Sequence, residues 1–331
     1  MESGINNVSP LLTIAIPTWN RASTIDKALE FLLDQVDEFK QYIEVVISNN
    51  ASEDNTDEII NAHMNNYPNI TYIYNVNEVN IGFFGNFKKC RELATGKYLW
   101  ILSDDDFVCA HVIHEIIDTL TKGNEYSTIF LKNDFKLNFF EKYELSCEKL
   151  LEKETYNIGL ISSVIFLNEK MNDKFLFDRY YESPFIGFIF LLNSFVYQKN
   201  TLILHGKCLL AANHKSSVSD FFDVFINGME QVIDYMYFMK FSNKIIKHFR
   251  NKYLCDFIRP SYILYKTEKE IHFSSREITP IEIIEERIKG KYSDLLYYWF
   301  SFFPFVLIPK IFLIVGLKFH RFLKSNSNVA K

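Results

Sequence analysis

Glycine is scarce in this sequence, with 11 in 331 residues, and none follows the first predicted strand directly. That strand, residues 11–16, leads into Pro17-Thr18-Trp19-Asn20-Arg21. A Rossmann phosphate turn and a P-loop both need glycines at this point, because their backbone must approach the phosphates closely. The sequence therefore excludes a nucleotide site built on either of these glycine turns.

Cysteine is scarce as well. The five cysteines are odd in number, lie far apart and form no C-x-x-C pair, which excludes a disulfide framework and a cysteine zinc site. We therefore expect reduced thiols in a cytosolic protein. Residues 1–10 lack the basic-then-apolar pattern of a signal peptide, so export is not expected.

Acidic residues are missing from the end of the chain. From Leu295 onward the sequence has five basic residues and no acidic one, whereas the rest has 31 basic and 41 acidic residues, a net charge of −10. An acidic body argues against a nucleic-acid partner, which needs an extended basic face. The basic end of the chain instead favours an anionic membrane surface.

The same tail is apolar but too short to cross a membrane. Residues 295–309 carry no charge, and 15 helical residues span only ~22 Å of a ~30 Å hydrocarbon core. Pro304 and Pro309 interrupt the helix, and Lys310 follows. We expect an interfacial or re-entrant anchor over about residues 295–324, peripheral or monotopic on the cytoplasmic side of the membrane. The alternative is a docking helix buried on the body or in a homo-oligomer.

Apolar runs alternate with amphipathic segments through the first 131 residues. The predicted strands cover residues 11–16, 43–47, 70–74, 98–102 and 128–131, with helices between them. This order predicts an α/β fold with a doubly wound, mostly parallel sheet. Ligands of such sheets bind beyond the carboxyl ends of the strands.

Polar clusters follow three of these strands, at residues 17–21, 48–54 and 104–106. The third is Asp104-Asp105-Asp106, whose three carboxylates repel one another at the end of a buried strand. A hard divalent cation with oxygen ligands would relieve that repulsion and would also neutralise a phosphorylated ligand. The alternative is that the three aspartates cap the following helix, whose N-terminal end favours acids.

Several segments together resemble family-two glycosyltransferases of the GT-A fold. The motifs are Pro-Thr-Trp-Asn-Arg at 17–21, Ser-Asn-Asn-Ala-Ser-Glu-Asp-Asn-Thr at 48–56, Asn-Ile-Gly at 80–82, and Ala-x-Gly-x-Tyr at 94–98 leading into the three aspartates. Their order and spacing match over about residues 11–125, most closely to bacterial, abequosyltransferase-like enzymes of surface polysaccharides. The resemblance implies a GT-A nucleotide-sugar and acceptor domain over 1–220 and a helical C-terminal region over 221–331.

The resemblance also implies a set of site residues. Those expected to bind the nucleotide are Pro17, Thr18, Asn20, Arg21, Asn49, Asn80, Asn86, Asp104 and Asp105. Those expected to hold Mg²⁺ or Mn²⁺ are Asp104, Asp106 and His214. Asn49 stands where the family usually has an aspartate that reads the base. Because an amide can donate as well as accept, a cytosine ring would also fit, and a pyrimidine base is favoured.

An inverting transfer needs a carboxylate that takes the proton from the acceptor hydroxyl. The resemblance places this base near residues 175–185, where Glu182 is the first candidate and Asp178 the second. The family often has a Glu-Asp pair here, and this sequence does not. The alternative role for Glu182 is that of an acid at a helix start.

These observations predict an inverting, metal-assisted glycosyltransferase. It would move a sugar from a nucleoside-diphosphate sugar to a saccharide acceptor, lipid-linked by our expectation, in bacterial surface polysaccharide synthesis. One alternative is a sugar-phosphate nucleotidyltransferase, which would want a glycine-rich turn after the first strand. Another is a catalytically inactive nucleotide-sugar-binding or scaffold protein.

Overall fold

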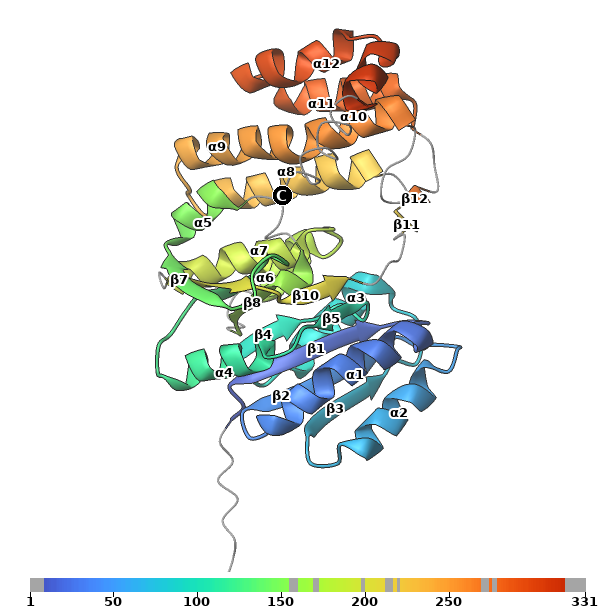
Figure 1. Cartoon of the computed structure of the whole chain (residues 1–331), viewed down its shortest axis with the longest axis vertical. Helices are drawn as coiled ribbons and strands as arrows, with labels where there is room; N and C mark the ends of the chain where they lie inside the picture. The colour runs from blue at the N-terminus through green and yellow to red at the C-terminus, as the bar shows by residue number, and fades with distance from the viewer. Residues whose placement is uncertain are drawn as a thin grey trace, which may run out of the picture. The chain divides into compact units, whose positions relative to one another are not determined.

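The computed structural model describes residues 9–154, 160–168, 173–197, 200–211, 217–218, 221–268, 274–275 and 279–318. The chain divides into two compact units, Met1–His214 and Lys215–Lys331 (Figure 1). The boundary expected from the sequence lies a few residues further along, at residue 220. His214 itself lies outside the described residues, so its expected role as a metal ligand stays a prediction.

An eight-stranded sheet forms the centre of the first unit, in the order β3-β2-β1-β4-β8-β6-β9-β7 (Figure 1). Its strands are β1 (Leu12–Thr18), β2 (Ile43–Asn49), β3 (Thr71–Val76), β4 (Tyr98–Ile101), β6 (Thr128–Asn133), β7 (Glu141–Leu145), β8 (Val164–Leu167) and β9 (Thr201–Gly206). Strands β7 and β8 run antiparallel to their neighbours, and the other six run in one direction. The predicted α/β class with a mostly parallel sheet is confirmed.

Helices pack on the sheet because its strands are apolar on both faces. The four between the first strands are α1 (Ala22–Glu38), α2 (Thr56–Asn66), α3 (Gly82–Leu93) and α4 (Val112–Thr121). Alternate strand residues such as Ile14, Val45 and Trp100 share one core cluster with Leu29 of α1 and Ile113 of α4. Successive strand residues point to opposite faces, and α3 packs on β1 and β2. This burial on both faces is what a doubly wound sheet requires.

The rest of the first unit consists of short helices and a separate two-stranded ribbon. Its elements are β5 (Asp106–Val108), α5 (Cys147–Lys153), η2 (Ile161–Ser163), α6 (Asp173–Tyr180), α7 (Ile186–Ser194), η3 (Phe195–Tyr197) and β10 (Leu209–Ala211). Strand β8 lies antiparallel between β4 and β6. The short helix η2 directly precedes β8 and therefore contacts β4. The two halves of the sheet therefore meet at a strand that comes late in the sequence.

The three aspartates do not cap a helix, so that alternative is wrong. Asp106 begins β5, which pairs with β10 in a separate two-stranded ribbon. Helix α4 starts only at Val112, after His111 in a left-handed conformation with φ of 68°. The three aspartates thus lie after β4 and up to the first residue of the ribbon, and none of them is at the start of a helix.

The carboxylate of Glu44, buried in β2, joins three segments of the sheet. It accepts hydrogen bonds from the Thr13 hydroxyl on β1, from the N–H and hydroxyl of Thr95, and from the Gly96 N–H. A Cβ at Gly96 would lie 2.7 Å from the Thr13 nitrogen, so the turn before β4 needs glycine to approach β1 this closely. This network holds β4 in register with β1 and β2.

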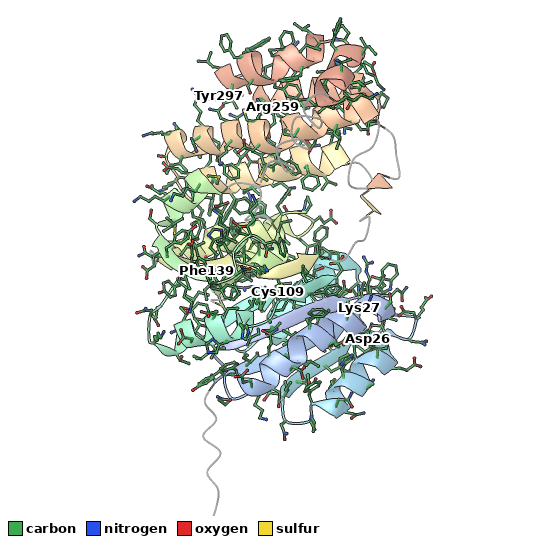
Figure 2. The ribbon with its side chains drawn as sticks, in the orientation of Figure 1. Asp26, Lys27, Cys109, Phe139, Arg259 and Tyr297 are labelled. Carbon is green, nitrogen blue, oxygen red and sulfur yellow. The ribbon has the colours of Figure 1, made fainter. Side chains whose placement is uncertain are left out.

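The second unit is mainly helical. Its elements are β11 (Ser217–Val218), α8 (Phe221–Phe238), α9 (Asn243–Tyr253), η4 (Leu254–Ile258), α10 (Arg259–Glu268), β12 (Ser274–Ser275), α11 (Ile281–Tyr292), η5 (Tyr298–Phe302) and α12 (Phe303–Leu307), followed by a helical segment Lys310–Lys318. Arg259, labelled in Figure 2, lies at the start of α10. Its guanidinium donates to the Ser301 hydroxyl of η5. The five cysteines, all within the described residues, form no disulfide with one another.

We predict that Glu44→Gln destabilises the protein by about 1–3 kcal/mol. In the wild-type protein both carboxylate oxygens accept hydrogen bonds, whereas the glutamine NH₂ group cannot accept one and would leave a buried donor without an acceptor. The measurement is urea unfolding followed by tryptophan fluorescence, since Trp100 is buried in the same unit. Glu78→Gln, at an exposed glutamate, is the matched control and should leave the midpoint unchanged. Equal midpoints for both variants would show that the network does not stabilise the fold.

Candidate active site

The carboxyl ends of β1, β2 and β4 meet at one edge of the sheet. Thr18 pairs with Asn49 across β1 and β2, and the Leu102 N–H after β4 donates to the Ala15 carbonyl of β1. A pocket of about 370 Å³ opens at this edge. It is lined by Pro17, Thr18, Trp19, Arg21, Asn50, Asn80, Gly82, Phe83, Asn86, Ile101, Ser103, Asp104, Asp105 and Ile161.

The pocket brings together most of the residues expected to bind a nucleotide. Those that line it are Pro17, Thr18, Arg21, Asn80, Asn86, Asp104 and Asp105. Asn20 and Asn49 are absent from the lining. Asn20 has a φ of 52°, and its side-chain oxygen accepts from the Glu53 N–H, so it holds the two flanking loops together. The expected contact of Asn20 and Asn49 with a nucleotide stays a prediction.

Asp104 is the most deeply buried of the three aspartates, with 7% of its surface exposed. Its Oδ2 accepts a hydrogen bond of 2.6 Å from the Thr18 hydroxyl at the end of β1. The Arg21 Nε lies 3.9 Å from its Oδ1. Burial raises the pKa of Asp104 to about 6, and these two contacts together with the Trp19 N–H oppose that rise. The carboxylate is therefore only partly compensated by the protein.

Asp105 and Asp106 are half-buried and differ in where they lie. Asp105 lines the pocket and accepts a hydrogen bond from the Ser103 hydroxyl. Asp106 is not among the lining residues, and its carboxylate accepts a hydrogen bond from Ser162. Burial raises the pKa of Asp106, and the Ser162 bond opposes that rise. Of the two aspartates expected first at the metal, Asp104 therefore faces the pocket and Asp106 lies beside it.

Asparagine side chains form one wall of the pocket. The Asn50 amide donates 2.8 Å to the Asn80 side-chain oxygen, while its own oxygen accepts from Asn77 and from the Ile81 N–H. Asn86 is buried on α3, and its amide donates to the Ser48 carbonyl at the end of β2. These bonds hold the loop before α3 against the end of β2 without any charged group.

Asn49 is turned into this scaffold and Asn50 takes the pocket position. The Asn49 Nδ2 donates to the Tyr74 hydroxyl at 3.3 Å, and its Oδ1 accepts from the Ser52 N–H. Both ends of its amide are therefore engaged with protein groups. Asn50, one residue later, lines the pocket. The sequence offered two adjacent asparagines after the strand, and only the turn that follows β2 determines which of them faces a ligand.

The donor set of the pocket fits a hard divalent cation. Asp104 and Asp105 present carboxylate oxygens and Ser103 a hydroxyl, all in the pocket lining. Mg²⁺ is commonly held by one or two carboxylates, with substrate phosphates and water as its other ligands. Among the described residues no group of three or more His, Cys, Asp or Glu side chains is placed to hold a metal. A cation here would therefore depend on the phosphates of a bound nucleotide.

The two candidates for the catalytic base are exposed and lie outside the pocket lining. Asp178 is on α6, and Glu182 follows that helix in a turn closed by the Ser183 N–H and the Tyr180 carbonyl. The neighbouring Tyr181 ring lies 6.3 Å from the ring of Phe84, which follows the pocket residue Phe83 on α3. This ring contact joins the turn that carries Glu182 to helix α3, and the role of Glu182 stays a prediction.

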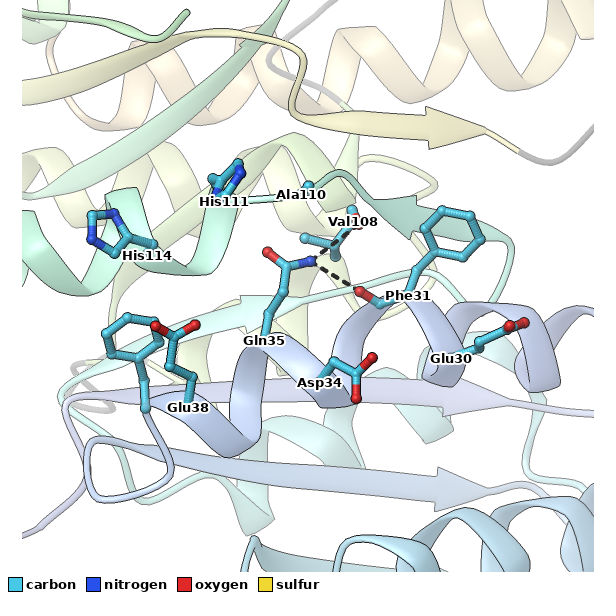
Figure 3. A pocket seen from close by; sticks show the side chains of 10 residues that line it. Glu30, Phe31, Asp34, Gln35, Glu38, Val108, Ala110, His111 and His114 are labelled. Carbon is cyan, nitrogen blue, oxygen red and sulfur yellow. Dashed lines mark hydrogen bonds between the residues drawn. The ribbon is translucent and has the colours of Figure 1, made fainter.

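A second groove, of about 580 Å³, lies between α1 and the segment from β5 to α4 (Figure 3). The α1 side carries Glu30, Asp34 and Glu38 along one stripe, and Gln35 donates to the carbonyls of Phe31 and Val108 (Figure 3). Three carboxylates on one wall would repel a diphosphate. The pocket at the strand ends is therefore the one suited to a nucleotide.

Sequence reasoning missed the apolar part of the pocket. Trp19, Phe83 and Ile101 line it, as does Ile161 from η2. Trp19 lies inside the motif at 17–21 and is 49% exposed, so the pattern gave a signal for it. Ile161 had none, because it reaches the pocket only through the antiparallel pairing of β8 with β4.

Comparison with known sequences identifies a family. A sequence model of glycosyl transferase family 2 matches residues 13–179, half of the chain. Abequosyltransferase RfbV of Salmonella typhimurium is 42% identical over 96 residues, which is 29% of this chain and 28% of that protein. The chain matches only about a third of the length of the first curated relatives, from 28% to 38%.

Solved structures share the fold. Staphylococcus aureus TarS 1–349 in complex with UDP-GlcNAc superimposes with a TM-score of 0.59 at 14% identity, covering 86% of this chain and 82% of that one. Mannosyltransferase PcManGT from Pyrobaculum calidifontis, in complex with GDP-Man and Mn²⁺, gives 0.50 at 13% identity, covering 75% and 70%. At these identities the likeness establishes the GT-A type of α/β fold.

We predict that ionisation of Asp104 lowers the stability of the protein in EDTA. Its folded pKa of about 6 lies above the ordinary 3.8, so its contribution is full below about pH 4 and is lost as the pH rises through 6. The loss is on the order of 3 kcal/mol. Urea unfolding at several pH values between 4 and 6 should show a free energy of unfolding that falls as the pH rises. The fall should be smaller in Asp104→Asn, and some of it should remain because burial also raises the pKa of Asp106. An unchanged slope in Asp104→Asn would contradict the assignment.

Proposed function

The chain belongs to glycosyl transferase family 2, and we propose that it transfers a sugar from a nucleoside-diphosphate sugar to a saccharide acceptor. We further propose that the transfer is metal-assisted and inverts the anomeric centre. The observation that carries this is the pocket at the ends of β1, β2 and β4, where Asp104 and Asp105 face the asparagine wall. The family membership supports the reaction class, and the pocket supports the donor class.

The donor would place its base and ribose against the asparagine wall and its diphosphate towards Asp104 and Asp105. Asn50 and Asn80 offer amide groups there, which can donate or accept hydrogen bonds. The two solved neighbours were crystallised with UDP-GlcNAc and with GDP-Man, so the shared fold accepts either kind of base. We keep the pyrimidine donor as our proposal on the family resemblance, in which Asn49 stands where the base is usually read. Asn50, one residue later, is the amide that lines the pocket.

The metal would be Mg²⁺ or Mn²⁺, held by Asp104 and Asp105, with Asp106 and His214 as the further candidates from the family resemblance. When bound, such an ion neutralises charge that develops on the leaving diphosphate. Arg21 is the cationic side chain in the described lining of the pocket, and its Nε lies 3.9 Å from Asp104. Arg21 would hold that carboxylate in place and add positive charge beside the phosphates.

The base would be Glu182, with Asp178 as the second candidate. Its carboxylate takes the proton from the acceptor hydroxyl while the oxygen forms a bond to the anomeric carbon. The bond from that carbon to the diphosphate breaks, and its electron pair leaves with the nucleoside diphosphate. Attack from the face opposite the leaving group inverts the centre. The ring contact between Tyr181, next to Glu182, and Phe84, next to the pocket residue Phe83, supports this choice.

The acceptor would be a lipid-linked saccharide used in bacterial surface polysaccharide synthesis. The basic and apolar character of the chain from Leu295 onward supports an acceptor at a lipid surface. Free thiols and the nucleotide-sugar donor both favour the cytoplasmic side. The alternative is an inactive nucleotide-sugar-binding protein, which the missing Glu-Asp pair would favour. The following experiment distinguishes this alternative from an active transferase.

We predict that the purified protein releases a nucleoside diphosphate from a pyrimidine-nucleotide sugar in the presence of Mn²⁺ or Mg²⁺. The release should stop in EDTA. A screen of UDP-, dTDP-, CDP- and GDP-sugars measures it, and a clear preference for GDP-sugars would contradict the pyrimidine proposal. Binding of the donor without release or transfer under any condition would favour the inactive protein.

We predict further that Glu182→Gln lowers kcat by about 10²- to 10⁴-fold with little change in KM for the donor, because the base acts in the transfer step. Asp178→Asn tests the second candidate in the same assay. Glu148→Gln, at an exposed glutamate of α5, is the control and should keep full activity. Wild-type kcat in Glu182→Gln would exclude it as the base.

A further inference from the structure

The second unit exposes an apolar surface that we call the apolar face. It consists of Leu296, Tyr297, Phe300, Leu307, Ile311, Phe312 and Val315, each between 55% and 81% exposed. Seven large apolar side chains within 20 residues are far more than scattered surface hydrophobics. Tyr297 is labelled in Figure 2. Such a patch indicates an interaction site.

The opposite side of the same segment is firmly packed. Tyr298, Phe302 and Leu313 are buried, and the Phe302 ring lies 4.9 Å from the ring of Tyr262 on α10. Within the same stretch, Leu296, Phe300 and Leu307 are exposed while Tyr298 and Phe302 are buried, so its exposed and packed sides are distinct. The apolar face is therefore the outer side of a segment whose inner side is already packed.

Two hydrogen bonds fix the point where this segment turns. The Lys266 ammonium of α10 donates to the carbonyls of Phe305 and Val306, 3.0 and 2.7 Å away, which are among the last of α12. These carbonyls would otherwise lack a partner at the helix end. After Pro309 the chain continues in the segment Lys310–Lys318, so the apolar face extends across a fixed bend.

The geometry fits a surface that lies along a membrane. In the described part of the chain no single helix is long and apolar enough to span a bilayer. Tyr298–Leu307 and Lys310–Lys318 pass that test only as a pair, and they are bent by 105° with respect to each other. An exposed apolar helix side of this length can lie in the interface between head groups and acyl chains without spanning the bilayer.

The basic residues around the apolar face favour an anionic lipid. Lys310 and Lys318 are exposed within the segment, and the sequence from Leu295 onward contains no acidic residue. Tyr297 and Trp299, which combine an apolar ring with a polar group, belong to the residue types enriched at membrane interfaces. We propose that the apolar face docks in the plane of an anionic lipid surface, with its lysines on the head groups.

A second copy of the chain is the main competing occupant. A two-fold dimer would place the same face against itself. That arrangement would bring the lysines of both copies together with no acidic residue from either tail to pair with them, which is unfavourable. Anionic lipid supplies the missing negative charge, so the observations favour the membrane.

The test is co-sedimentation of the full chain with vesicles of phosphatidylcholine containing about 30% phosphatidylglycerol. We expect the wild-type chain to bind, and to bind at least several-fold more weakly to pure phosphatidylcholine or at about 0.5 M salt. The variant Phe300→Ser with Ile311→Ser should lower the partition coefficient by about a hundredfold or more, because two large apolar side chains no longer enter the interface.

The matched control makes the same two changes elsewhere, as Phe139→Ser with Ile283→Ser, where the side chains are 60% and 41% exposed. It should bind like wild type. Equal loss of binding in both double variants, or binding to neutral vesicles that equals binding to anionic ones, would overturn the proposal. So would a dimer in sedimentation velocity without lipid that Phe300→Ser with Ile311→Ser dissociates while vesicles bind nothing. No sugar or nucleotide is present, so the outcome is independent of the transfer assay.

Discussion

The buried Glu44 carboxylate is the constraint on which the site depends, because it fixes β1, β2 and the start of β4 relative to one another. Side chains alternate along a strand, so a slip of one residue would turn every side chain to the opposite face. With the register fixed at the amino ends, Thr18 and Asp104 meet at the carboxyl ends. The polar pocket is thus a consequence of a hydrogen-bond network at the other edge of the sheet.

The pocket combines uncharged asparagine side chains with one buried carboxylate, that of Asp104, whose ionisation is unfavourable. Its asparagines bond to one another and to backbone groups, so they hold their shape without counter-ions. Asp104 is different, because it is buried beside a single arginine that does not make a close ion pair with it. Retaining such a group lowers the stability of the empty protein, and it leaves a strong preference for a positive charge where a phosphate would enter.

Local patterns predicted strands β1, β2, β3, β4 and β6 and the position of the three aspartates, because apolar runs and polar strand ends are visible within a few residues. Contacts between distant segments were not predictable in this way. Asn50 rather than Asn49 faces the pocket because of the turn after β2, and Asp106 leaves it because β5 pairs with β10, about 100 residues later. Ile161 enters the pocket only because β8 pairs with β4.

The position of β8 also has a consequence for synthesis of the chain. Strands β1 to β4 are complete by Ile101, and their pairings with one another lie within that stretch. The free edge of β4 waits for Val164–Leu167, which closes it and links it to β6. During translation an unpaired strand edge would therefore be open while more than sixty residues are added, which makes this nascent half-sheet the stage most exposed to aggregation.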